Sequence, residues 1–217
     1  MLEFLDGVSV HPYRSPNKSP ETAAADYERL RQLIDRHAPP SKKGKLPIVS
    51  GEWGYSTCTK GVSLERQAAF AARQQLFNLF SGIPLSIWYD WKNDGPDPKE
   101  NEHNFGTVLP DLSPKPAYLA IQILTRELAG YHIVERRTLT SDQDFALECA
   151  DAAGQQKLVA WTTGERHLTS LPVPGVLDGP LRAVNFQGQP LSPRVTEGLL
   201  ALDLDAGPQY VTIGHPK

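Results

Sequence analysis

Three short motifs bring together side chains that could do chemistry, and each lies at the end of an apolar run typical of a β-strand. They occupy residues 9–13 (SVHPY), 50–55 (SGEWGY) and 88–91 (WYDW). Because side chains alternate along an extended chain, His11 and Tyr13 share one face. A carboxylate such as Glu52, straight after an apolar strand, costs stability unless it is paired or functional. The three motifs together predict a site built at strand ends.

The elements that must position these motifs alternate between strand and helix up to about residue 130. Residues 6–11, 46–51 and 83–89 are short apolar runs that predict strands, and each precedes a helical pattern. Such alternation indicates parallel βα units. In a parallel α/β barrel the carboxyl ends of the strands form the active-site face, so the three motifs are expected to meet there.

Each predicted helix has a recognisable beginning and end. Ser19 followed by Pro20, Ser63, and Ser113 followed by Pro114 are predicted N-caps. The second helix is expected to end at Phe80, before Gly82, and the third at Gly130. The predicted buried stripes contain Tyr27, Leu30, Leu33 and Ile34 in the first helix, Phe70, Phe77 and Phe80 in the second, and Tyr118, Ile121, Leu124 and Leu128 in the third.

Residues 131–217 follow a different pattern. Short alternating runs at 133–139, 145–149, 157–162, 181–186, 199–204 and 209–213 are separated by turn signals such as 151–154 (DAAG). No helical period remains, so this part predicts an antiparallel β-sandwich domain. The predicted fold class is therefore α/β plus all-β, with domains at 1–130 and 131–217.

The residue types at the strand ends suit a sugar ligand. Pyranose rings present C–H faces to aromatic rings and hydroxyl edges to polar groups, and Trp53, Trp88 and Trp91 could supply the aromatic faces. Asp90 adds a polar group. Glycosidic cleavage needs two carboxyl groups, about 5–5.5 Å apart when configuration is retained. Glu52 could be one carboxyl group of such a pair.

The order of these motifs resembles strands six, seven and eight of clan A glycoside hydrolases, closest to the family 39 and family 5-like retaining β-glycosidases. Residues 104–106 (NFG) and 111–118 (DLSPKPAY) are similar to the passage that leads into the last barrel helix of those enzymes. The resemblance covers residues 5 to about 130. It implies the C-terminal part of a (β/α)8 TIM barrel, followed by a β-sandwich.

The resemblance also implies roles for single residues. Glu52 would be the nucleophile, with His11 and Tyr13 hydrogen-bonding it or the adjacent sugar and Trp88 forming the floor of the sugar site. The family's acid/base is a glutamate after an asparagine at the end of strand four. The only such pair here, Asn101-Glu102, lies after strand eight. Strands one to five are thus expected to come from a missing N-terminal barrel half or from a second copy.

The resemblance implies an oligo- or polysaccharide substrate, and composition argues against two other classes of partner. A net charge of -3 offers no polycationic surface for nucleic acid, and no apolar run approaches the length of a membrane span. Cys58 and Cys149 are expected to be unpaired thiols. The polar loop at 94–103 is expected to be solvated rather than metal-binding, and no cofactor is needed. Residues 1–7 lack the regions of a signal peptide, so the compartment stays open.

Two other functions remain as alternatives. The aromatic residues could bind glycan without cleaving it, which would make the chain a non-catalytic carbohydrate-binding or pseudoenzyme fragment. An α/β hydrolase is a third reading, but the sequence contains no Gly-x-Ser-x-Gly elbow. A retaining β-glycosidase is the leading hypothesis.

Overall fold

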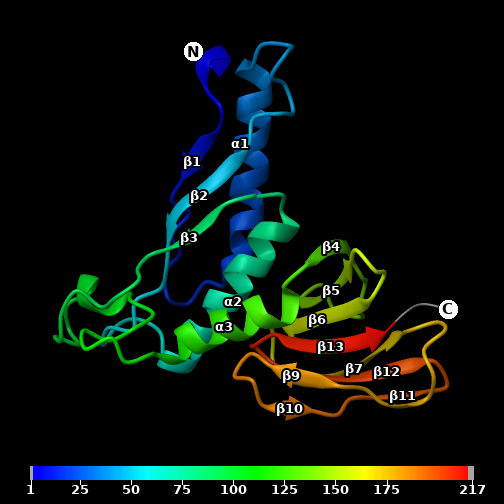
Figure 1. Ribbon diagram of the computed structural model, residues 1–217. Helices are drawn as coiled ribbons and strands as arrows, with labels where there is room; N and C mark the ends of the chain where they lie inside the picture. The colour runs from blue at the N-terminus through cyan, green and yellow to red at the C-terminus, as the bar shows by residue number, and fades with distance from the viewer. Residues whose placement is uncertain (1, 215–217) are drawn as a thin grey trace. The chain divides into compact units, whose positions relative to one another are not determined.

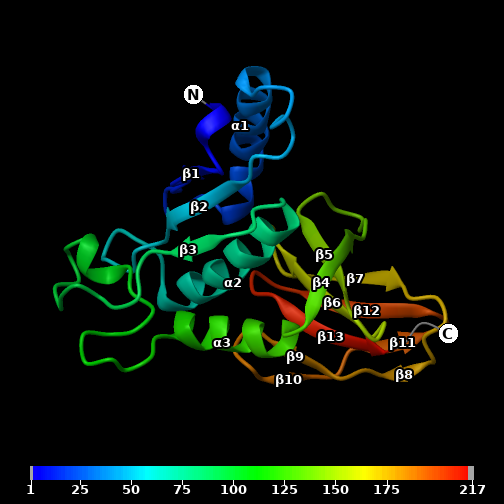
Figure 2. The ribbon, with the colours of Figure 1, turned by 45° about the horizontal axis from the view of Figure 1, so that its top comes forward.

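The computed structural model describes residues 2–214 and consists of two compact units, one up to Pro114 and one from Lys115 onward. The first is mixed α/β, and the second combines one helix with antiparallel sheets (Figures 1 and 2). The boundary between the two units falls after Pro114 in the sequence, whereas the change of periodicity falls near Gly130. The helix that precedes Gly130 therefore belongs to the second unit.

A three-stranded parallel sheet is the centre of the first unit. Its strands are β1 (Val8–Val10), β2 (Ile48–Trp53) and β3 (Ser86–Trp88), in sequence order across the sheet. Val8 is in register with Ile48, and Ser50 with Ser86, both in parallel pairing. The predicted parallel arrangement of three consecutive βα units is thus confirmed for their strands.

Two helices pack on this sheet, α1 (Ala24–His37) and α2 (Leu64–Phe80). The hydroxyl of Tyr27 on α1 donates to Asn78 on α2 at 2.9 Å, and the amide of Asn78 donates to Ser86 on β3 at 2.8 Å. This buried chain of hydrogen bonds connects both helices to the sheet. Short 3₁₀ turns lie at Leu2–Phe4 (η1), Pro20–Ala23 (η2) and Glu102–Asn104 (η3).

The helix predictions hold at some ends and fail at others. Ser63 caps α2 as predicted, because its side chain accepts from the backbone N–H of Arg66 at 3.1 Å. Downstream of Pro20 the chain first forms the 3₁₀ turn η2, and α1 begins only at Ala24. Leu33 and Phe80, predicted to be buried, are 50% and 38% exposed. Periodicity gives the direction of an apolar face but not how far a neighbour covers its edges.

An ion pair inside the first unit has no signature in the sequence pattern. Arg73 on α2 donates from two nitrogens to Glu21 in η2, at 2.7 and 2.6 Å, and both side chains are buried. A bidentate pair of this kind satisfies both charges, whereas removing one partner would leave the other buried and uncompensated. The pair therefore attaches η2, and the start of α1 with it, to α2.

The second unit begins with α3 (Pro116–Leu128), two residues later than predicted. The predicted cap residue Ser113 is used in a turn, because its backbone N–H and hydroxyl both donate to Asp111. Lys115 stands at the N-cap position instead, followed by Pro116 as the first helical residue. The helix ends before Gly130, whose φ of 82° is the left-handed conformation that glycine tolerates best.

Antiparallel sheets form the rest of the second unit. One has six strands in the order β10-β9-β13-β6-β5-β4, and the other has four in the order β7-β12-β11-β8. Their bounds are β4 Tyr131–Arg136, β5 Asp144–Asp151, β6 Gln156–Thr162, β7 His167–Pro172, β8 Gly179–Pro180, β9 Ala183–Asn185, β10 Pro190–Leu191, β11 Arg194–Thr196, β12 Leu199–Leu204 and β13 Gln209–Gly214. The predicted all-β character after residue 130 is confirmed.

Strand β7 was not predicted, because its apolar residues do not mark one face. Leu171 is buried, whereas Leu168 is 79% exposed. A clean alternation of apolar and polar residues, as in β12, is what identifies a half-buried strand. The short strands β8, β10 and β11 also escape prediction, because two or three residues are too few to show a period.

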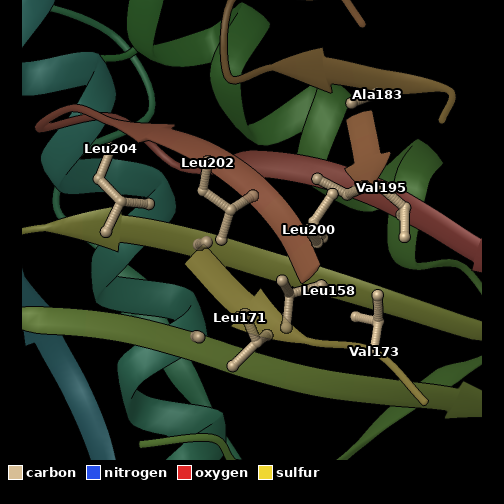
Figure 3. Close-up of a cluster of buried hydrophobic side chains, with 11 residues drawn as sticks. Leu158, Leu171, Val173, Ala183, Val195, Leu200, Leu202 and Leu204 are labelled. Carbon is tan, nitrogen blue, oxygen red and sulfur yellow. The ribbon is translucent and has the colours of Figure 1, made fainter. Parts of the chain in front are cut away.

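The two sheets contribute to one hydrophobic core, part of which Figure 3 shows. Leu158 comes from the six-stranded sheet, and Leu171, Leu200 and Leu202 come from the four-stranded sheet. These side chains have at most 1% of their surface exposed. The burial of this apolar surface is the main source of the unit's stability.

A charge cluster around the buried Glu127 holds α3 to the six-stranded sheet. Glu127 accepts hydrogen bonds from Lys157 at 3.1 Å and from two nitrogens of Arg182 at 3.2 Å each. Burial alone would raise the pKa of Glu127, but the hydrogen bonds from Arg182 and Lys157 outweigh it and lower the pKa to about 2. Glu127 therefore stays ionised while it is buried.

Leu200→Ala should destabilise the second unit by about 2–5 kcal/mol, because it leaves a cavity in the shared core. Leu199→Ala is the matched control on the same strand, since Leu199 is 45% exposed and its loss should cost at most about 1 kcal/mol. Hydrogen exchange of peptides from β6 and β12 measures the opening free energy. Equal losses for both variants would contradict the assigned core.

The Glu127 cluster should make the second unit sensitive to acid. The folded-state pKa of about 2 lies below the usual 4.5, so the stabilisation is complete above pH 4.5 and is lost as pH falls toward 2. The full effect is on the order of 3 kcal/mol. Melting temperatures measured from pH 6 to 2 should fall less steeply in Glu127→Gln than in the wild type. Parallel curves would show that Glu127 does not titrate as described.

Candidate functional site

The carboxyl ends of β1, β2 and β3 bring the three predicted motifs together. His11 follows the last residue of β1, Glu52 is the penultimate residue of β2, and Trp88 is the last residue of β3. Because the strands are parallel neighbours, their motifs share one edge of the sheet. Trp88 is in register with Trp53, the residue after Glu52.

Glu52 and Tyr13 are in direct contact. The hydroxyl of Tyr13 donates to Oε1 of Glu52 at 2.8 Å. Nδ1 of His11 is 3.9 Å from the same oxygen, which is too long for a direct hydrogen bond. The side chains of His11 and Glu52 keep 53% and 39% of their surface exposed. The prediction that the Glu52 carboxylate lies within hydrogen-bond reach of Tyr13 or His11 is therefore confirmed for Tyr13.

Tyr13 acts as the donor in this pair. Burial of the phenol raises its pKa well above the usual 10, and the hydrogen bond to Glu52 and the charge of Glu52 raise it further. The hydroxyl thus remains protonated throughout the neutral range. A neutral donor orients the carboxylate and leaves its negative charge available for a ligand.

The glycines on either side of Glu52 allow the neighbouring chain segments to approach closely. A Cβ atom added at Gly51 would overlap Oγ of Ser9 on β1. A Cβ atom at Gly54 would overlap the backbone carbonyl oxygen of Tyr89. The first conflict involves a side chain, but the second involves backbone and could be relieved only by moving the chain. Gly54 is therefore required where the segments after β2 and β3 meet.

The predicted aromatic residues differ in exposure. Trp53 has no exposed surface, so its ring packs in the core and cannot stack on a sugar, which corrects the prediction that it binds substrate. Trp88 is half-buried, and its indole N–H donates to the carbonyl oxygen of Phe105 at 3.2 Å. Trp91 is 61% exposed. Trp88 and Trp91 remain the aromatic candidates for ligand contact.

Asp90 stabilises the turn that follows β3. Its carboxylate accepts from the backbone N–H of Lys92 at 2.7 Å, which stabilises the turn after the strand. The peptide bond between Tyr89 and Asp90 is cis. Asp90 is half-buried, so part of the side chain stays accessible at the strand end.

Three residues of this region, Tyr89, Glu102 and Phe105, were not predicted as site residues from the sequence. The hydroxyl of Tyr89 donates to Oε2 of Glu102 at 3.3 Å. The ring of Phe105 packs edge-on against Tyr13, with centroids 6.1 Å apart, and against Tyr89 at 5.3 Å. The motif at 104–106 could have drawn attention to Phe105, but Glu102 sits in a loop whose composition is typical of solvated segments.

Cys58 and Cys149 are both free, as predicted. Among residues 2–214, no helix is long and apolar enough to cross a membrane. Within the same residues, no group of three or more His, Cys, Asp or Glu side chains has an arrangement that could hold a metal ion.

Solved structures with similar folds include glycoside hydrolases. The fold agrees with that of a family 39 glycoside hydrolase from the gut symbiont Bacteroides cellulosilyticus at a TM-score of 0.83 and 28% sequence identity. That alignment covers 98% of this chain and 45% of the other. This chain resembles a family 39 glycoside hydrolase. It spans less than half of the length of that protein, and no family model and no curated protein matches its sequence.

More distant structures share the fold alone. A glucosidase from Croceicoccus marinus matches at a TM-score of 0.64 and 17% identity, over 98% of this chain and 54% of the other. A family 51 arabinofuranosidase from Xanthomonas axonopodis pv. citri matches at 0.57 and 14%, over 96% and 52%. The predicted resemblance to clan A glycoside hydrolases is thus confirmed, and the chain has the fold of a glycosidase fragment at a coarse level.

Tyr13 should not ionise where an ordinary tyrosine does, because its pKa is raised by burial and by Glu52. Absorbance of tyrosinate at 295 nm, followed from pH 9 to 11, should therefore give the same amplitude in the wild type and in Tyr13→Phe. In denaturant the amplitude of the wild type should exceed that of Tyr13→Phe by one tyrosine. A difference of one tyrosinate between the native proteins would contradict the buried donor.

Proposed function

We propose that this chain is the C-terminal portion of a retaining β-glycosidase and that Glu52 is its nucleophile. In this proposal β1, β2 and β3 correspond to barrel strands six, seven and eight of a TIM barrel domain spanning residues 1–130, and residues 131–217 form a β-sandwich accessory domain. The observation that carries the proposal is the 2.8 Å hydrogen bond from Tyr13 to Glu52 at the carboxyl ends of adjacent parallel strands. The similarity to a family 39 enzyme at 28% identity supports it.

The chemistry follows from a carboxylate that is oriented but not neutralised. Glu52 attacks the anomeric carbon, the glycosidic C–O bond breaks, and a covalent glycosyl-enzyme forms through an oxocarbenium-like transition state. Water then cleaves the ester, and the sugar leaves with its configuration retained. Tyr13 and His11 contact Glu52 or the sugar beside it, and Trp88, Asp90 and Trp91 line the substrate site. No cofactor takes part.

The acid/base carboxyl group has to come from elsewhere. By the resemblance it ends strand four, whereas the first unit has a parallel sheet of three strands. A TIM barrel closes with eight strands, so five more are needed to complete the wall around the sugar. In our proposal an N-terminal barrel half, or a second copy of the chain, supplies both those strands and the acid/base. Without them the chain hydrolyses ordinary glycosides weakly or not at all, since general acid–base catalysis contributes about 10²–10⁴-fold.

Covalent labelling tests the nucleophile without requiring an acid. A 2,4-dinitrophenolate leaves unprotonated, so 2,4-dinitrophenyl 2-deoxy-2-fluoro-β-glycosides should trap a fluoroglycosyl ester on Glu52. Peptide mass spectrometry of the 217-residue chain should find the label in the peptide containing Glu52. Glu52→Gln should abolish labelling, whereas Glu65→Gln, at an exposed carboxylate on α2, should leave it unchanged.

A label on another residue, or labelling that persists in Glu52→Gln, would show that Glu52 is not the nucleophile. Sugar binding without any label would instead favour the non-catalytic carbohydrate-binding alternative, which no contact among residues 2–214 supports over the enzyme.

A further inference from the structure

Hydrogen bonds attach the loop after β3 to the segment that follows β2. The backbone N–H of Thr59 donates to the carbonyl oxygen of Pro98 at 2.7 Å. The hydroxyl of Ser56 donates to the backbone carbonyl oxygen of Asn101 at 2.8 Å. The backbone N–H of Thr57 donates to Asn104 at 3.1 Å. These bonds hold residues 98–104 in a defined position, which the polar composition of the loop does not suggest.

Glu102 lies on this loop, and hydrogen bonds orient both of its carboxylate oxygens. Oε2 accepts from the hydroxyl of Tyr89 at 3.3 Å, and Oε1 accepts from the side-chain amide of Asn101 at 3.0 Å. An ionised carboxylate has about four lone-pair sites, so each oxygen keeps acceptor capacity. The side chain is exposed, and that capacity is open to a ligand.

Glu102 is connected to Glu52 through a pair of tyrosines. Tyr13 donates to Glu52 and Tyr89 donates to Glu102, and both tyrosine rings pack edge-on against Phe105. The loop that carries Glu102 therefore borders the strand-end site. Glu102 also acts electrostatically on Tyr13: after burial and the effects of Glu52 and Tyr89, its charge adds to the raised pKa of that phenol.

The charge around the two tyrosines favours a neutral ligand. Burial raises the pKa of Tyr89, and the charges of Glu102, Asp94 and Asp90 raise it further. Carboxylates thus act on both tyrosines of the site. A sugar acid brought among them would meet like charges, whereas a neutral sugar would offer hydroxyl donors to the same oxygens.

We propose that Glu102 is a specificity-determining residue whose carboxylate accepts hydrogen bonds from neighbouring hydroxyl groups of a neutral sugar seated beside Glu52. The proposal rests on the proposed glycosidase site and extends it to the class of sugar bound. Glu102 does not act as the missing acid/base in this role. It selects neutral pyranosides and disfavours uronic acids.

The test is equilibrium binding, which does not depend on catalysis. Ligand-observed NMR titrations of the 217-residue chain would use the methyl β-glycosides of glucose, galactose, xylose and glucuronic acid. The best neutral glycoside should bind at least about tenfold more weakly to Glu102→Gln, since a hydrogen bond to a charged group contributes about 1.5–3 kcal/mol. Glu100→Gln, which removes an exposed carboxylate from the same loop, should bind like the wild type.

The difference in affinity between the glucuronide and the neutral glycosides is a second readout, which would not change if Glu102 had only a structural role. The wild type should bind the glucuronide more weakly than the neutral glycosides, and Glu102→Gln should narrow that difference. Equal affinity of the wild type and Glu102→Gln for every glycoside, or no binding of any of them to the wild type, would overturn the role of Glu102.

Covalent labelling separates this inference from the proposed function. A labelled Glu52 together with unchanged binding in Glu102→Gln would overturn only the role of Glu102. Sugar binding that depends on Glu102, without a label on Glu52, would support that role and overturn the nucleophile.

Discussion

Parallel pairing of three consecutive strands is the constraint on which the site depends. It aligns the carboxyl ends of β1, β2 and β3, so residues that are about forty positions apart in sequence become neighbours. The hydrogen bond from Tyr13 to Glu52 exists only in this arrangement. A shift of the pairing register of β2 by one residue would turn Glu52 to the opposite face of the sheet, since side chains alternate along a strand.

Close packing at the strand ends and buried charges in each unit hold the elements in place. Gly54 lets the backbone at Tyr89 approach the end of β2, where any side chain would collide with the Tyr89 carbonyl. Arg73 with Glu21 ties η2 to α2 in the first unit, and Glu127 with Lys157 ties α3 to β6 in the second. Each of these buried charges has its partner, which is the condition under which such groups are tolerated.

The sequence contains enough information for the strand order and the catalytic candidate, but not for the surroundings of the site. The apolar run before Glu52 and the glycines beside it predicted a strand-end carboxylate, and Tyr13 lies within hydrogen-bond reach of it. Trp53 was predicted as a ligand contact and is buried, because a motif does not reveal which face of the strand the helices cover.

The position of Glu102 could not be predicted for a related reason. It depends on hydrogen bonds between loops, such as Ser56 to Asn101, that join residues 45 positions apart and follow no period. Strand β7 escaped prediction because its two leucines lie on opposite faces, with Leu171 buried and Leu168 exposed, and burial there is decided by tertiary packing. Local patterns thus predict regular elements, and long-range contacts decide the details of the site.

The anomeric configuration of a trapped product tests the central claim most directly. With a 2,4-dinitrophenyl β-glycoside and azide, a chain that has a nucleophile but lacks an acid/base should release the β-glycosyl azide, because two displacements at the anomeric carbon restore the original configuration. Proton NMR distinguishes the two anomers. The wild type should give the β-anomer and Glu52→Gln should give no azide product, whereas an α-glycosyl azide, or a product that persists in Glu52→Gln, would contradict the role of Glu52 as nucleophile.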